Sequence, residues 1–115
     1  MTNIYLRESN GQKEIICKGH SGYAVAGQDI VCSAVSILTY SFNRLAIEMD
    51  KRNKLQLNIL KISDGEVHTL VSDPANLIAT SFFMLRMGLE SLQENYPENV
   101  KIYLEWEDFL KASMQ

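Results

Sequence analysis

The residues most suited to chemistry lie in the segment 19–36, where a histidine, His20, precedes a cysteine, Cys32, by twelve residues. A helix is predicted to begin just before the cysteine, since Asp29 is a favourable N-cap residue. In the first turn of a helix, the free N–H groups and the helix dipole favour an anion, here the Cys32 thiolate. A nearby histidine can accept the thiol proton and later give it to a leaving amine. The pattern is typical of a cysteine nucleophile with a histidine base.

Two further polar residues of this segment are candidates for supporting roles. Asp29 has two competing roles: as a cap it bonds the backbone near Cys32, and as an orienter it accepts a hydrogen bond from His20. The sequence leaves both roles open. Ser36 lies one turn beyond Cys32 on the predicted helix, where it either contacts substrate or packs against a neighbour. The N–H groups of the first turn are also expected to stabilise the oxyanion formed when a thiolate attacks a peptide carbonyl.

The loop that joins the histidine to the helix is rich in glycine. Gly22 and Gly27 allow this loop to fold back and bring His20 towards Cys32. We expect the loop to bind substrate and to move when a peptide enters. Tyr23, in the same loop, is a candidate to close over the site, although a loop tyrosine is more often a surface anchor.

Non-catalytic roles for the cysteines and histidines are the alternative interpretations. Cys17 falls in a predicted strand, where a buried thiol behaves as an inert hydrophobe, and His68 alternates within a hairpin strand as a surface residue. A zinc site could draw on both of these residues together with His20 and Cys32. Only Cys17 and His20 have the close spacing of a ligand pair, however, and structural zinc sites usually combine two such pairs. No metal or cofactor is therefore expected.

The composition restricts the class of protein. A chain of 115 residues with 46% hydrophobic and 22% charged residues is ordinary for one globular domain, spanning 1–115. A net charge of −3 argues against a nucleic-acid surface, which needs clustered Lys and Arg. No apolar run approaches the roughly 20 residues of a membrane span. Nor does the N-terminus resemble a signal peptide. We therefore expect a cytoplasmic protein with reduced thiols and no membrane contact.

The elements that must hold these residues follow from hydrophobic periodicity. In order, they are strands at 4–8 and 14–18, a helix at 30–51, strands at 55–59 and 66–71, a helix at 74–95 and a strand at 100–106. Asn10–Gly11 and Asp64–Gly65 predict hairpin turns. Asp73 is the expected cap of the second helix, with Pro74 at its first position. The order ββαββαβ predicts an α+β fold: a mostly antiparallel sheet with two helices packed on one face.

Both helices carry more apolar residues than one buried stripe requires. The residues off the main stripes are Ile37, Tyr40, Ile47, Phe83, Met84 and Met87. Helices that are apolar nearly all round are buried on more than one side. In a two-layer domain this leaves contact between the helices or a homodimer interface, and the surplus favours the homodimer.

The motif around the histidine and cysteine also identifies a family. Gly19-His20-x-Gly22-Tyr23, followed by Gly27-x-Asp29-Ile30-Val31-Cys32-x-Ala34-x-Ser36, closely resembles the ribosomal-processing cysteine proteases called Prp. The segment from Gly88–Leu89 to Tyr96–Pro97 and the length are also similar, so the resemblance covers nearly the whole chain. Ser21 and the pair at 25–26 differ from the family pattern, at loop positions to which no catalytic role is attached.

The resemblance implies an endopeptidase that removes a short N-terminal extension from ribosomal protein bL27, cutting beside an aromatic residue. It implies that His20 and Cys32 are the catalytic pair, that Asp29 supports them, and that the protein is a homodimer. Related bacteriophage sequences process virion proteins, so a phage-type protease is an alternative. A non-catalytic dimeric module that binds a protein partner is a second alternative, but it leaves the histidine and cysteine unexplained.

Overall fold

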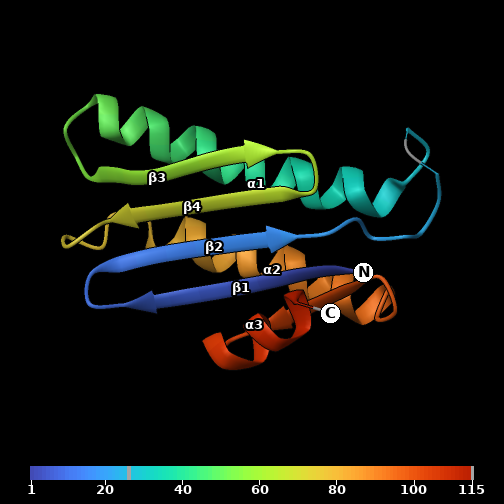
Figure 1. The fold of residues 1–115 in the computed structure, drawn as a ribbon. Helices are drawn as coiled ribbons and strands as arrows, with labels where there is room; N and C mark the ends of the chain where they lie inside the picture. The colour runs from blue at the N-terminus through green and yellow to red at the C-terminus, as the bar shows by residue number, and fades with distance from the viewer. Residues whose placement is uncertain (26, 115) are drawn as a thin grey trace.

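The structure is a computed structural model that describes residues 1–25 and 27–114, and its elements follow the order ββαββαβα (Figure 1). Ala26, at one of the positions that differ from the family pattern, lies outside the described residues. The elements are β1 Thr2–Ser9, β2 Gln12–Lys18, α1 Ile30–Lys51, β3 Gln56–Ser63, β4 Glu66–Ser72, α2 Ala79–Asn95, β5 Val100–Tyr103 and α3 Trp106–Ser113. The predicted α+β class and the bounds of the first helix are confirmed, and one helix was missed.

The strands form one sheet in the order β3-β4-β2-β1-β5. All neighbouring pairs are antiparallel except β1 and β5, which run parallel, so the mostly antiparallel prediction is confirmed. At the first hairpin Asn10 and Gly11 have φ of 53° and 72°, the two positive values that a tight hairpin turn requires. The second hairpin brings Asp64 and Gly65 to the same end of the sheet as the start of α1 (Figure 1).

One face of the sheet is covered by α1 and α2, which contact each other (Figure 1). The main core lies between these helices and the sheet. Its residues without exposed surface are Ile4, Ile15, Ala46, Val71, Leu89 and Val100. Gly88 lets α2 approach α1 closely, because a Cβ there would lie 2.9 Å from Leu38 Cδ2. The predicted placement of these two helices on one face is correct.

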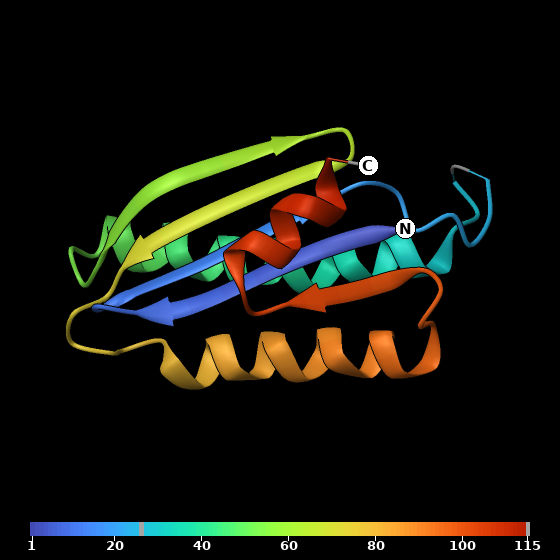
Figure 2. The same cartoon turned by 60° about the horizontal axis from the view of Figure 1, so that its bottom comes forward.

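The third helix corrects the prediction of a final strand reaching Trp106. The strand β5 ends at Tyr103, and Trp106 begins α3 on the opposite face of the sheet (Figure 2). Phe109 is 1% exposed there and contacts Tyr5 and Ile16, the outward-facing residues of β1 and β2. Burying these rings stabilises a helix that the alternating pattern of 100–106 does not reveal.

The start of the second helix also differs from the prediction. α2 begins at Ala79, and Asp73 and Pro74 lie in a turn before it, because the Asp73 carboxylate binds the buried Lys13 ammonium at 3.0 Å. The same carboxylate accepts hydrogen bonds from the N–H groups of Leu77 and Ile78 at 2.9 and 3.0 Å. Burial opposes ionisation of Asp73, but these N–H bonds and Lys13 outweigh it and lower the pKa of the carboxyl.

Two properties of the helices are relevant to contacts with a membrane or with another protein chain. By length and composition alone α1 could cross a membrane, the only such helix among the described residues. A core helix meets the same test, and α1 buries Val31, Val35 and Phe42. The apolar surplus remains on the surface of the single chain: Ile37 is 64% exposed and Met84 74%.

Candidate active site

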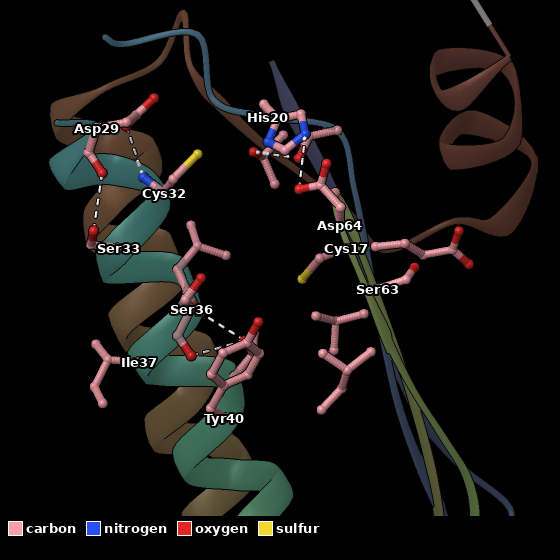
Figure 3. A pocket seen from close by; sticks show the side chains of 18 of the residues that line it. Cys17, His20, Asp29, Cys32, Ser33, Ser36, Ile37, Tyr40, Ser63 and Asp64 are labelled. Carbon is pink, nitrogen blue, oxygen red and sulfur yellow. Dashed lines mark hydrogen bonds and ion pairs between the residues drawn. The ribbon is translucent and has the colours of Figure 1, made fainter. Parts of the chain in front are cut away.

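A cavity of about 840 Å³ opens between the first half of α1 and the β3–β4 hairpin (Figure 3). Its walls include Cys32 and Ser36 from α1, Asp64 from the hairpin, and His20 and Gly27 from the loop that connects β2 to α1. The sequence-predicted histidine and cysteine therefore share one cavity. Figure 3 shows them on opposite sides of it, with the Cys32 sulfur directed into the space between.

Asp29 is the N-cap of α1. It has extended backbone angles (φ −84°, ψ 97°), and its Oδ1 accepts the Cys32 N–H at 2.9 Å. Of the two roles that the sequence left open for Asp29, the capping role is the one seen in the structure. In the described part of the chain Asp29 makes no hydrogen bond to His20. The Cys32 N–H, one of the donors expected to stabilise an oxyanion, is thus already engaged.

The second carboxylate oxygen of Asp29 fastens the loop to the helix. Oδ2 accepts the Ser21 hydroxyl at 2.5 Å and the N–H groups of Tyr23 and Ala24 at 3.2 and 3.3 Å. Burial raises the pKa of this carboxyl, but the hydrogen bonds from Ser21, Cys32 and Ala24 outweigh burial and hold it well below its usual range. Asp29 is therefore ionised at neutral pH, and its carboxylate organises the loop.

Ser21 is the residue that contacts the cysteine sulfur directly. Its backbone N–H donates to Cys32 Sγ at 3.3 Å, and its hydroxyl oxygen lies 3.4 Å from the same sulfur. The side chain is buried, with the residue 1% exposed. No role was predicted for Ser21. The available signal was a small hydroxyl residue directly after His20, within a loop short enough to return to Cys32.

His20 is paired with the hairpin, and its partner was not predicted. Its Nε2 lies 3.6 Å from Asp64 Oδ1, and the two side chains are 65% and 97% exposed. The neighbouring Gly19 N–H donates to the Gly65 carbonyl at 2.8 Å, which ties the loop to the hairpin turn. Asp64, assigned only to a turn by the sequence, thus lies beside the imidazole.

The remaining predicted residues divide between the cavity and its surroundings. Ser36 and Gly27 line the cavity, whereas Gly22 and Tyr23 are not among the described lining residues. The Tyr23 ring instead meets the Tyr96 ring edge-on, with 5.3 Å between ring centroids. In this structure the Tyr23 ring therefore anchors the loop to Tyr96 and does not line the cavity.

The alternative zinc site is not assembled in the part of the chain that the structure describes. No group of three or more His, Cys, Asp or Glu side chains converges there as a metal site would require. Cys17 is buried, and desolvation raises the pKa of its thiol to about 12. The His68 Nε2 lies 2.7 Å from Glu14 Oε2, so this imidazole is engaged with a strand neighbour.

Comparison with known proteins gives one consistent family. The family model described as cysteine protease Prp matches residues 1–101. The ribosomal processing cysteine protease Prp of Mycoplasma genitalium is 25% identical over 91 residues, which span 79% of this chain and 87% of that protein.

Solved structures show the same fold. The Prp protease from S. aureus with a covalently linked product peptide superposes with a TM-score of 0.74 at 20% identity, over 91% of this chain and all of that one. SMU.848 from Streptococcus mutans gives a TM-score of 0.60 at 22% identity, over 90% of this chain and 93% of that one.

Proposed function

The chain belongs to the cysteine protease Prp family, and from that premise we propose that it removes the N-terminal extension of ribosomal protein bL27. The relative in Mycoplasma genitalium is described as a ribosomal processing protease, which supports this class of substrate. The observation that carries the assignment of the site is the position of Cys32. It lies in the first turn of α1, with its sulfur facing a cavity that His20 also lines.

Cys32 is the proposed nucleophile and His20 the proposed base. The Cys32 thiol gives its proton to the imidazole, and the thiolate forms a C–S bond to the scissile carbonyl. The C–N bond then breaks as the leaving amine takes the proton from the His20 imidazolium. Water hydrolyses the thioester, which releases the new carboxyl end and restores the Cys32 thiol. No metal or cofactor takes part in this sequence.

For this transfer His20 must leave Asp64 and approach Cys32. The pair between His20 and Asp64 is largely exposed, so breaking it costs little, on the order of 0–1 kcal/mol. Gly22 and Gly27 have φ of 72° and 85°, values that glycine adopts without strain. The loop backbone on both sides of Tyr23 can therefore change conformation. We propose that the loop moves as the peptide enters the cavity and brings the imidazole to the sulfur.

The start of α1 provides the electrostatics of the reaction. The positive end of the helix dipole lies beside Cys32, where it favours both the thiolate and the oxyanion of the tetrahedral intermediate. Since the Cys32 N–H is bonded to Asp29, other donors at this end of the helix would bind the oxyanion. Asp29 supports the site by holding the loop, and Ser36 by lining the path of the substrate.

The working form of the enzyme is proposed to be a cytoplasmic homodimer of a single domain. The exposed apolar side chains of α1 and α2 would be covered by a second copy. Among them, Phe83 is 59% and Met84 74% exposed. Both cysteines are free thiols, which suits a reducing compartment and a ribosomal substrate.

The test is cleavage of bL27 with and without its extension. The native chain should shorten only the extended form, with a chelator present or absent. His20→Ala should cleave at least about 100-fold more slowly, because general base catalysis contributes 10²–10⁴-fold. His68→Ala is the matched control and should keep near-native rates. Extended bL27 left intact by the native chain, or cleavage of a virion protein in its place, would overturn the substrate assignment. Sensitivity to the chelator would overturn the metal-free mechanism.

A further inference from the structure

The turn between α2 and β5 reaches the loop that carries His20. Asn99, in this turn, donates from Nδ2 to the Ser21 carbonyl at 3.0 Å, a contact between residues 78 apart in the chain. The rings of Tyr96 and Tyr23 form a second contact between the same two segments. The turn lies at the end of the sheet where α1 begins (Figure 2). It has no part in the chemistry proposed above, yet it holds the loop.

Asn99 is itself fixed by its main chain. Its N–H donates to the Tyr96 carbonyl at 2.9 Å, and its carbonyl accepts the Thr2 N–H of β1, also at 2.9 Å. Thr2 is buried, with 3% of its surface exposed. The Asn99 side chain is therefore presented to the loop by a main chain that is hydrogen-bonded to the C-cap of α2 and to β1.

The residue that Asn99 holds is the one that contacts the cysteine sulfur. The Ser21 N–H donates to Cys32 Sγ at 3.3 Å. The Ser21 hydroxyl donates its proton to the Asp29 carboxylate, so its oxygen only accepts from the Cys32 thiol, at 3.4 Å, and the N–H is the donor that Ser21 offers to the sulfur. A hydrogen bond to a charged acceptor is stronger than one to a neutral acceptor, so the N–H favours the thiolate over the thiol. Moving Ser21 away would remove this donor.

We propose that Asn99 is a positioning residue for Cys32: by holding Ser21, it keeps the Ser21 N–H on the sulfur and so stabilises the thiolate. Asn99 is not itself one of the residues that line the cavity, and its side chain bonds to the Ser21 carbonyl rather than to the sulfur. The inference rests on the proposed function only in taking Cys32 as the nucleophile. Ser21 and Asn99 come from distant parts of the sequence, and the contact between them links the loop between β2 and α1 to the turn between α2 and β5.

The test measures the thiolate without any substrate. In a Cys17→Ala background, the rate of Cys32 alkylation by iodoacetamide is followed from pH 5 to 10. Asn99→Ala should raise the pH midpoint of alkylation by about one unit, since a hydrogen bond to a charged group is worth roughly that much. Asn99→Asp, which keeps the shape but replaces the donor with an acceptor, should raise it at least as far.

Asn95→Ala is the matched control. Asn95 Nδ2 also donates to a backbone carbonyl, that of Ser91 at 2.8 Å, but on the exposed surface of α2. This variant should keep the native midpoint. Thermal unfolding of all variants shows which of them are folded. If Asn99→Ala is unfolded, the alkylation midpoint of Asn99→Asp tests the proposal instead.

Cleavage of bL27 provides a second readout. Asn99 is not itself a cavity-lining residue, so replacing its side chain should leave KM nearly unchanged. The kcat should fall about tenfold, which corresponds to a shift of about one unit in the alkylation midpoint. A native alkylation midpoint in both Asn99 variants would overturn the proposal even if bL27 is cleaved. A shifted midpoint in a chain that does not cleave bL27 would support the positioning role and overturn the substrate instead.

Discussion

His20 Nε2 lies 3.6 Å from Asp64 Oδ1, at the rim of the cavity and across it from the Cys32 sulfur (Figure 3). The histidine is therefore held by the β3–β4 hairpin, while the cysteine is held by Ser21 and Asp29. In this structure the side chains of the proposed dyad therefore have different partners, an ion-pair partner for His20 and hydrogen-bond partners for Cys32. The proposed mechanism requires His20 to leave Asp64 and approach Cys32.

Replacing Asp64 should have a small effect on the reaction. An exposed ion pair is worth up to about 1 kcal/mol, so Asp64→Asn should change kcat/KM by less than about fivefold. The measurement is the initial rate of bL27 cleavage beside that of His20→Ala. A loss as large as that of His20→Ala would make Asp64 a third member of the catalytic group.

Gly65 should be intolerant of a side chain because of both its backbone and its neighbour. Its φ is +71°, and a Cβ there would lie 3.1 Å from His20 Nε2. Gly65→Ala should lower the free energy of unfolding by about 1–2 kcal/mol through backbone strain, and should also displace the imidazole. Urea unfolding and the cleavage rate together measure the two effects.

Gly11→Ala is the control for that variant. Gly11 has φ of +72° at the other hairpin, where a Cβ would lie 3.4 Å from Pro74. The Gly11→Ala substitution should lower the free energy of unfolding by a similar amount and leave the cleavage rate per folded molecule unchanged. Equal rates for the two alanine variants would show that the hairpin does not position His20.

The elements with local signals were the ones that the sequence could predict. α1 begins and ends at the predicted residues, because Asp29 caps it and its apolar residues follow helical periodicity. The third helix was missed because the alternation of Val100, Ile102 and Leu104 continues to Trp106 without a break. Its helical form depends on burial of Phe109 against Tyr5, a contact that no local pattern records.

The candidate site depends on the same kind of local signal. His20 and Cys32 were singled out from their residue types and from the predicted helix start, and both line the cavity. Asp64 was missed because its contact with His20 joins residues 44 positions apart. Asp followed by Gly is accounted for by the hairpin turn alone, because both residues favour turn conformations. The sequence therefore offers no reason to assign Asp64 a second role.

Asp29 should make the stability of the protein depend on pH at acid values. Its folded pKa lies below its usual range, so its contribution is present above the unfolded value of about 4 and is lost as pH falls below it. Asp29→Asn should show less loss of stability between pH 5 and 3 than the native chain. At pH 7, Asp29→Ala should cost about 1 kcal/mol or more through loss of the cap. Urea unfolding at both pH values checks this, and an unchanged acid dependence in Asp29→Asn would contradict it.

The buried pair of Lys13 and Asp73 should matter for folding and not for cleavage. Asp73→Ala leaves the Lys13 ammonium, 2% exposed, without its nearest carboxylate and leaves two N–H groups without an acceptor. A loss of about 3–5 kcal/mol is expected. Lys13→Met should cost less, because Asp73 keeps the N–H donors of Leu77 and Ile78. Urea unfolding ranks the two variants, and the reverse order would contradict this account of the turn before α2.

The most direct test of the central claim compares the two cysteines in one assay. Both cysteines line the cavity, but Cys17 is buried with a pKa of about 12, whereas Cys32 is half-buried at the start of α1. Initial rates of cleavage of extended bL27 are measured for the native chain, Cys17→Ala and Cys32→Ala, each shown to be folded. The account predicts near-native cleavage by Cys17→Ala and none by Cys32→Ala. Cleavage by Cys32→Ala would contradict it.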